Sequence, residues 1–243
     1  MSRITKIAAL AIAVAFAGTY AQAEGDEDGR AWPWSPLGIG IAAPIQLPFM
    51  SSDIYGLRLG GAFGYNADVY GLDCGIVEMT SGSLAGLQCA AFTWTSGSAY
   101  GVQCAGLANV VDGFFYGHES AAVNVVWGEL WGVQSGLVNY DGAMFGVQFG
   151  ALLNWNNSVS CGWQTGIANA DQEDFCGFSD GVVNYAGKFV GFQLGVVNVA
   201  DDATGFQLGV VNSAGRMHGV QIGALNLIVD SALPVMVIAN ASF

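Results

Sequence analysis

The side chains that most often carry catalysis are scarce in this chain. Its only histidines, His118 and His218, lie far apart, whereas zinc-binding histidines usually occur in close pairs. A nucleophilic site would need His218 to meet the thiol of Cys161 or Cys176, which lie in distant segments. The chain has no H-E-x-x-H, P-loop or G-x-S-x-G motif. We therefore expect no catalytic residue, no metal site and no cofactor, and we expect both histidines to face solvent.

A group of acidic residues is the second candidate for chemistry. Asp171, Glu173, Asp174 and Asp180 lie close together in the sequence. Polysaccharide lyases built on β-helices use carboxylates of this kind, but their sites generally need basic partners too. Lys188 is the nearest basic residue. We therefore interpret the group as a charged loop.

The five cysteines recur at regular positions. Cys74, Cys89 and Cys104 share one position of a repeated pattern, and Cys161 and Cys176 share another. If equal positions lie one strand spacing apart, they fall within the disulfide Cα range of about 4.4–6.8 Å. A Cys161–Cys176 disulfide and one pair among the other three would then form. The alternative is that each cysteine packs as a small apolar side chain, and at least one thiol stays free or pairs outside the chain.

Composition limits the classes of partner. Of the 243 residues 53% are hydrophobic and only 10% are charged, and the formal net charge is −13. Disordered chains and coiled coils need more charges or helix formers, so both are excluded. Nucleic acid is excluded as a partner because phosphate would repel 19 acidic residues set against 6 basic ones.

The first segment has the features of a secretory signal. Arg3 and Lys6 form a positive start, an apolar stretch follows, and Ala21-Gln22-Ala23 fits the cleavage rule. We expect a signal peptide over residues 1–23. An acidic tail and N-terminal cap follow over 24–54, then a repeat domain over 55–232 and a C-terminal strand over 233–243.

A tandem repeat dominates the rest of the chain. Each unit has the pattern G-Φ-Q-x-G-Φ-Φ-N followed by a turn, where Φ is apolar, and units start 14 to 16 residues apart. The starting glycines are Gly56, Gly71, Gly86, Gly101, Gly117, Gly132, Gly146, Gly162, Gly177, Gly191, Gly205 and Gly219. Apolar β-formers alternate with polar residues, which predicts strands and not helices. We expect an all-β parallel β-solenoid of about twelve rungs.

Columns of equal residues favour the solenoid, because parallel stacking places equal positions directly above one another. Glutamines and asparagines would form hydrogen-bonded ladders along the stack. The ladder residues are Gln88, Gln103, Gln134, Gln148, Gln164, Gln193, Gln207, Gln221, Asn139, Asn169, Asn184, Asn198, Asn212 and Asn226. A pre-glycine column would form an aromatic ladder, or a surface for a glycan or lipid. Its members are Tyr55, Tyr70, Tyr100, Tyr116 and Trp131.

Two families share parts of this pattern. Gln193-x-Gly195-x-x-Asn198-x-Ala200 and its copy at 207–214 resemble the core of curlin repeats, which build surface amyloid fibres from stacked strands. The chain from residue 24 onward is similar to bacterial surface repeat-containing proteins, with tandem G-Φ-Q-x-G-Φ-Φ-N units and a terminal strand such as 233–240. The second resemblance implies a bacterial envelope location and no known activity.

An antiparallel up-and-down outer-membrane β-barrel is the alternative fold. The last residues alternate and end in Phe243, and 14-residue units could hold membrane strands. The main hypothesis is a non-enzymatic exported repeat protein of a Gram-negative-type envelope, at the outer membrane, the cell surface or in the periplasm, with a structural or adhesive role. The alternative is a barrel with a transport or pore role. Expected partners are envelope lipid, another protein chain, a glycan or a further copy.

Overall fold

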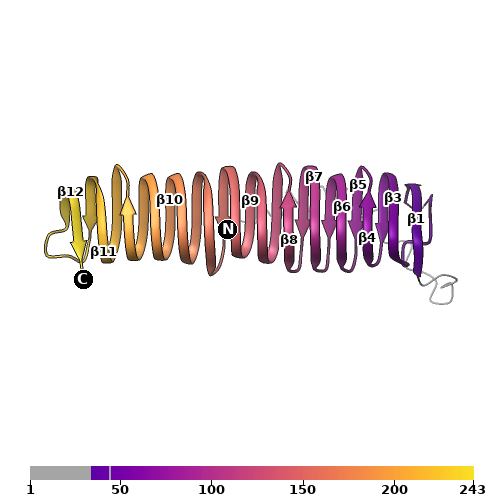
Figure 1. The fold of residues 1–243 in the computed structure, drawn as a ribbon, viewed down its shortest axis with the longest axis horizontal. Coiled ribbons are helices and arrows are strands. Elements are labelled where there is room, and N and C mark those ends of the chain that lie inside the picture. The colour runs from indigo at the N-terminus through magenta and orange to yellow at the C-terminus, as the bar shows by residue number, and fades with distance from the viewer. Residues whose placement is uncertain (1–33, 44) are drawn as a thin grey trace. The chain divides into compact units, whose positions relative to one another are not determined.

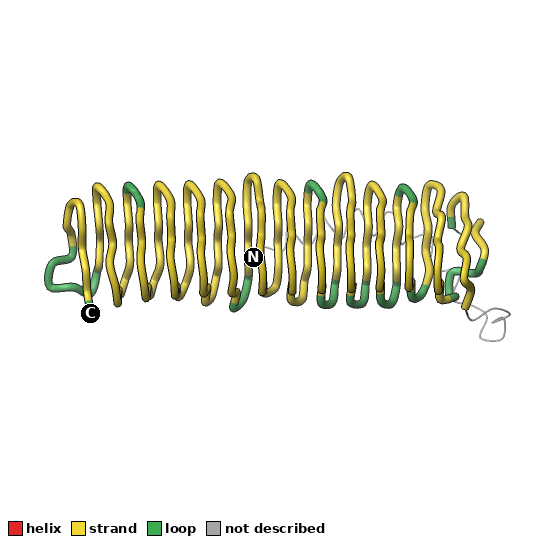
Figure 2. Tube along the Cα trace, in the orientation of Figure 1, coloured by secondary structure: helices red, strands yellow, loops and turns green. Residues whose placement is uncertain are grey.

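A computed structural model describes residues 34–43 and 45–243 of the chain. The expected signal peptide over 1–23 and the acidic tail over 24–30 lie outside the described residues. The described part is almost entirely strand and contains no helix. It winds as one coil of about 13 turns, one more than the twelve repeat glycines predict (Figure 1, Figure 2).

Each turn contributes one strand segment to each of two parallel stacks. For example, β4 pairs with the start of β3 and the start of β6, while β5 pairs with the ends of the same two strands. The strands are β1 (Trp34–Ala42), β2 (Ile45–Leu47), β3 (Asp53–Asn66), β4 (Val69–Cys74), β5 (Val77–Thr80), β6 (Leu84–Thr95), β7 (Ala99–Val111), β8 (Phe115–Ser120), β9 (Val123–Asn156), β10 (Ser160–Leu208), β11 (Val211–Ile228) and β12 (Val235–Ser242). The longest strands pass through several turns without a break. We call the two stacks the glutamine face, which includes β4, and the asparagine face, which includes β5.

The pairing is parallel and in register from turn to turn. Gly71 pairs with Gly86 and Gly86 with Gly101, and the next residues of each unit pair in the same way. The same alignment joins Gly205 to Gly219 between β10 and β11. The parallel β-solenoid is therefore confirmed. The antiparallel up-and-down alternative is wrong for the described residues.

The repeat glycines lie inside the strands of the glutamine face, as Gly71 does in β4. All twelve have φ between 119° and 148°, a conformation that residues with a side chain rarely adopt. At Gly132 an added Cβ would lie 2.0 Å from the carbonyl oxygen of Gly117 in the turn before. These glycines therefore permit both the backbone conformation and the close approach of successive turns.

Different strands close the two ends of the stack. At the N-terminal end, β1 pairs in parallel with β3 and antiparallel with β2, so residues 34–42 form a further turn ahead of the first repeat glycine. At the C-terminal end, β12 pairs antiparallel with β11. These reversals of direction end the parallel stack at both sides, with β2 and β12 as its terminal strands.

We predict that Gly132→Ala lowers the free energy of unfolding by about 3 kcal/mol, because the new side chain combines a strained backbone with a steric clash. Gly106→Ala is the control, since its added Cβ would meet only the Cα of Ala91 at 3.9 Å. It should change stability by no more than about 0.5 kcal/mol. Equal denaturant midpoints for the two variants would contradict this account of the glycine column.

Candidate functional site

An unbroken ladder of asparagine side chains runs inside the asparagine face. From Asn109 to Asn226, each Nδ2 donates to the Oδ1 of the asparagine one turn later, at 2.8–3.0 Å. Most of these amides donate their second hydrogen to a backbone carbonyl of the following turn, as Asn198 does to Leu208 at 2.9 Å. All the asparagines in the ladder are buried. The predicted members Asn139, Asn169, Asn184, Asn198, Asn212 and Asn226 all lie in it.

The glutamines form a second buried column inside the opposite face, and its bonds point the other way. Gln103 donates to Gln88 at 2.8 Å, and Gln221 donates to Gln207 at 2.8 Å, in each case toward the preceding turn. All eight predicted glutamines are buried, but the column is less continuous than the asparagine ladder. Acidic residues and Ser179 occupy some of its positions, so some amides bond sideways to carboxyl groups instead.

Buried carboxyl groups are the feature that reasoning from the sequence missed. Asp73, Glu78, Glu119, Asp141 and Asp171 are at most 1% exposed. Burial raises the pKa of Glu119 to about 8 and that of Asp171 to about 7, and it raises the pKa of Asp141 well above its ordinary value. Counting positions from each repeat glycine would have revealed two of them, because Asp73 and Glu119 take the place of the column's glutamine.

The acidic group around residue 171 is therefore divided. Asp171 points into the interior and accepts hydrogen bonds from Asn156 at 2.8 Å and Gln164 at 2.9 Å. The interpretation of this residue as part of a charged loop is wrong, because it occupies an inward position of the strand. Glu173 and Asp174 lie on the outside, and Asp174 pairs with Lys188 at 3.6 Å.

One buried cation balances the acids near the N-terminal end. Arg58 contacts Asp73 at 2.5 Å and Glu78 at 3.0 Å. Burial, together with the neighbouring Asp73, raises the pKa of Glu78 to about 8. One guanidinium group thus faces two carboxyl groups. Its single positive charge is balanced when one of the two acids is ionised and the other is protonated.

Glu119 stands at a position of the glutamine column where most other turns have glutamine. Its Oε2 accepts a hydrogen bond from Gln134 at 2.9 Å, as the carbonyl oxygen of a glutamine would. Among the residues that the structure describes, its Oε1 has no hydrogen-bond partner, and neither does Oε1 of Gln103, its register neighbour in the preceding turn. A proton on Glu119 turns two acceptors into a donor and an acceptor, which continues the column. The raised pKa agrees with this protonated state at neutral pH.

The aromatic column lies on the outside of the glutamine face. Tyr55 and Tyr70 stack with ring centroids 4.8 Å apart, and Tyr100 and Tyr116 stack at 5.5 Å. Trp131 continues the column at 6.0 Å from Tyr116. All five predicted residues are between 36% and 50% exposed, so the column is a packed ladder with one side open to a ligand.

The cysteines divide as two stacks, both on the glutamine face. A disulfide joins Cys161 and Cys176, whose Cα atoms are 4.5 Å apart. Cys74, Cys89 and Cys104 are free and partly exposed, and they are register partners on three successive turns. Each neighbouring pair among the free thiols therefore repeats the parallel arrangement that the disulfide already bridges.

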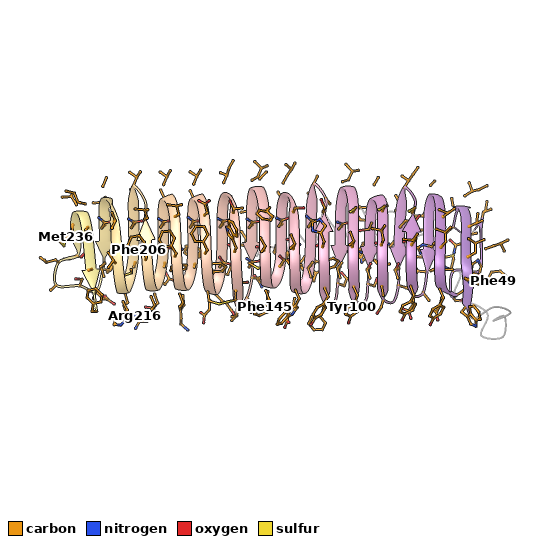
Figure 3. All side chains as sticks on the ribbon, in the orientation of Figure 1. Phe49, Tyr100, Phe145, Phe206, Arg216 and Met236 are labelled. Atoms are coloured by element: carbon orange, nitrogen blue, oxygen red, sulfur yellow. A yellow bond between two sulfur atoms is a disulfide. The ribbon has the colours of Figure 1, made fainter. Side chains whose placement is uncertain are left out.

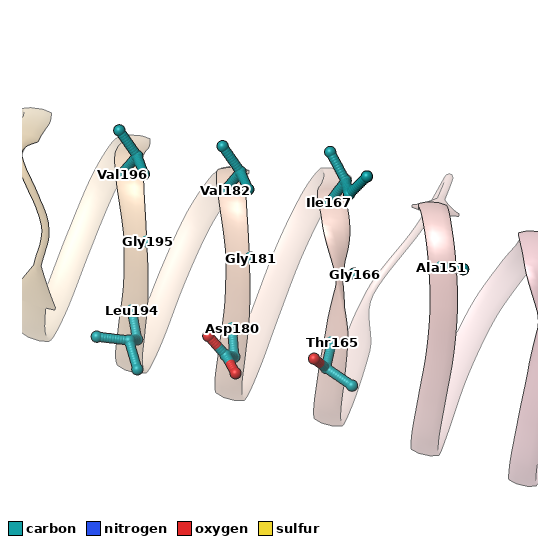
Figure 4. Close-up of a pocket in the computed structure, with 10 residues that line it drawn as sticks. All are labelled: Ala151, Thr165, Gly166, Ile167, Asp180, Gly181, Val182, Leu194, Gly195 and Val196. Carbon is teal, nitrogen blue, oxygen red and sulfur yellow. The ribbon is translucent and has the colours of Figure 1, made fainter.

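An apolar ridge runs along the corner between the two faces (Figure 3). Its aliphatic side chains are half exposed on successive turns. From the middle of the stack onward the ridge consists of Leu137, Leu152, Ile167, Val182, Val196 and Val210. Beside it, Gly166, Gly181 and Gly195 form the floor of a shallow groove, with Thr165, Asp180 and Leu194 on the other wall (Figure 4).

The described residues contain no cluster of side chains that could bind a metal ion. They also contain no helix that is long and apolar enough to cross a membrane. His118 and His218 are exposed on separate turns. Comparisons with family models, curated proteins and solved structures find no match for this chain. The chemistry that the arrangement itself offers is binding on long surface rows, thiol–disulfide exchange, and proton binding in the interior.

We predict that Glu119→Gln stabilises the protein at high pH and has little effect at low pH. The buried acid keeps its proton up to about pH 8, whereas in the unfolded chain it ionises near its ordinary pKa of 4.5. Folding therefore takes up a proton between these values, and stability falls as the pH rises. The variant should gain on the order of 3 kcal/mol over the native chain at pH 9 and almost nothing at pH 4.

Chemical unfolding at both pH values measures this difference. Glu173→Gln is the matched control, because it removes an exposed carboxylate with the same change of charge. A gain for Glu119→Gln that is equal at pH 4 and pH 9 would refute the protonated state.

We also predict that oxidised glutathione forms one disulfide among the free thiols, always through Cys89. In this exchange two protein thiols give up two protons and two electrons and form a disulfide. Glutathione disulfide takes up these protons and electrons and becomes two molecules of reduced glutathione. Burial raises the pKa of the Cys89 thiol, so the reaction should be faster at alkaline pH. Cys89→Ser should form none, because Cys74 and Cys104 lie two turns apart, about 9.6 Å. Peptide mapping that finds a Cys74–Cys104 bond would contradict the register.

Proposed function

We propose that this chain is a non-enzymatic, exported repeat protein of a Gram-negative-type cell envelope that acts as a structural or adhesive surface element. The apolar ridge is the observation that carries the proposal. Ile167, Val182 and Val196 are 52%, 47% and 46% exposed on consecutive turns. A monomer in water gains nothing from such a row, and large exposed apolar surfaces usually mark protein or membrane contacts.

The interior supports a structural role. The asparagine ladder, unbroken from Asn109 to Asn226, and the less continuous glutamine column of opposite donor direction join successive turns in addition to the backbone hydrogen bonds. Such a stack is built to hold a row of side chains at a constant spacing of about 4.8 Å. A surface that repeats one chemistry along its length suits an extended partner, such as a lipid surface or a fibrous chain.

Two further observations support export. The Cys161–Cys176 disulfide suits an oxidising compartment, because cytosolic thiols are normally kept reduced. The sequence also predicts a cleaved signal over residues 1–23. Fractionation of cells that express the native chain should place it in the envelope without its signal, and deletion of 2–23 should retain it in the cytoplasm. Equal distribution of the two chains would contradict the export part of the proposal.

We predict that Ile167→Thr, Val182→Thr and Val196→Thr together reduce binding to hydrophobic beads and to bacterial lipid vesicles at least fivefold. Threonine keeps the β-branched shape but carries a hydroxyl, so thermal stability should change little. The control is a triple variant that combines Ser81→Thr, Ser96→Thr and Gln172→Thr. These three positions are exposed and lie away from the ridge. Equal binding by both triple variants would contradict an adhesive role for the ridge.

A further inference from the structure

The aromatic column on the glutamine face is interrupted at one turn. Tyr70, Ala85 and Tyr100 are successive register partners, so the backbone register continues through this turn and only the aromatic ring is missing. Rings stack on both sides of the interruption, between Tyr55 and Tyr70 and between Tyr100 and Tyr116, with interplanar angles of 9°. The turn that contains Ala85 thus presents a methyl group where its neighbours present a ring.

The missing ring leaves a slot of defined height. Tyr70 and Tyr100 lie two turns apart, which corresponds to about 9.6 Å between their backbones. A flat ring midway between them would lie about 4.8 Å from each, within the range of offset aromatic stacking. The Tyr55–Tyr70 pair already stacks at that centroid separation. The slot therefore has room for one ring and is too narrow for two.

The two rings that border the slot are partly exposed and are each packed against a further ring. Tyr70 is 36% exposed and Tyr100 is 46% exposed, so their rings stand out from the sheet on either side. Each is supported from behind by the next ring of the column, at 4.8 Å and 5.5 Å respectively. A ligand would find both walls already in place, which reduces the entropy lost on binding.

The charges around the slot are negative. The pKa of Tyr70 is raised, mainly by the carboxylate of Asp68 and further by Asp53. Asp68 also accepts a hydrogen bond from the backbone N–H of Ser83, which holds it beside the turn that contains Ala85. The only Lys or Arg between residues 45 and 130 is Arg58, and it is buried against Asp73 and Glu78. The slot therefore attracts cations.

We infer that the slot over Ala85 is a binding site for one planar, positively charged aromatic molecule, stacked between Tyr70 and Tyr100. Stacking supplies the contact area, and Asp68 with Asp53 supplies the preference for positive charge. The inference does not depend on the proposed envelope role. It rests on the ring geometry, the register and the local charge.

Thioflavin T, a flat cationic dye, is a suitable probe for the full chain. We expect it to bind with a stoichiometry of one, measured by fluorescence titration. Ala85→Tyr fills the slot and should weaken binding at least tenfold. Thr204→Tyr is the matched control, because it adds a tyrosine at an exposed position of the same column, away from the slot, and should leave binding at Ala85 unchanged.

A second pair of variants guards against a folding defect in Ala85→Tyr. Tyr100→Leu removes one wall and should weaken binding at least tenfold, whereas Tyr55→Leu alters the ring behind the other wall and should change it less than threefold. Asp68→Asn should weaken thioflavin T binding but leave a neutral benzothiazole of the same ring size unaffected. Undiminished binding to Ala85→Tyr, or several dye molecules per chain with equal affinity, would overturn the inference.

Discussion

Most buried side-chain amides in this protein take a hydrogen-bond partner one turn away, and this pairing sets the register of the stack. An unpaired amide in a dry interior costs about 1–3 kcal/mol, so a misplaced turn would carry several such penalties at once. A slip of one residue would also exchange the inward and outward side chains of a strand. Units of different length are still accommodated, because an extra residue is absorbed at the corner, as between Ala105 and Ala108, which face Ala90 and Phe92.

The amides and acids make part of the interior polar but give it little charge, and they share it with a cluster of buried apolar side chains that includes Leu84, Phe115 and Phe175. Asparagines donate toward the C-terminal end and glutamines toward the N-terminal end, so the dipoles of the two columns oppose each other. Acids fit into this interior as protonated groups, or beside the buried guanidinium of Arg58. The exterior carries an apolar ridge and an aromatic column, and we attribute function to these outer rows.

The parallel solenoid could be predicted because the glycine, glutamine and asparagine columns all repeat with one period. The Cys161–Cys176 pairing followed from the same register. Asp171 was misinterpreted because neighbouring acids suggested a loop, although its distance from Gly162 matches that of Asp141 from Gly132. The first turn, residues 34–42, lacks the repeat pattern, and only its pairing with β3 reveals it. The slot over Ala85 needed the ring geometry, because the sequence shows only one missing aromatic residue.

Distance measurement between spin labels tests the stacking most directly. Labels at Ala85 and Thr204, with Cys74, Cys89 and Cys104 replaced by serine, occupy the same column eight turns apart. Stacked turns predict a separation of about 38 Å, and moving the first label to position 100 or 116 should shorten it by about 4.8 Å per turn. Separations that do not change in proportion to the number of turns would contradict the account.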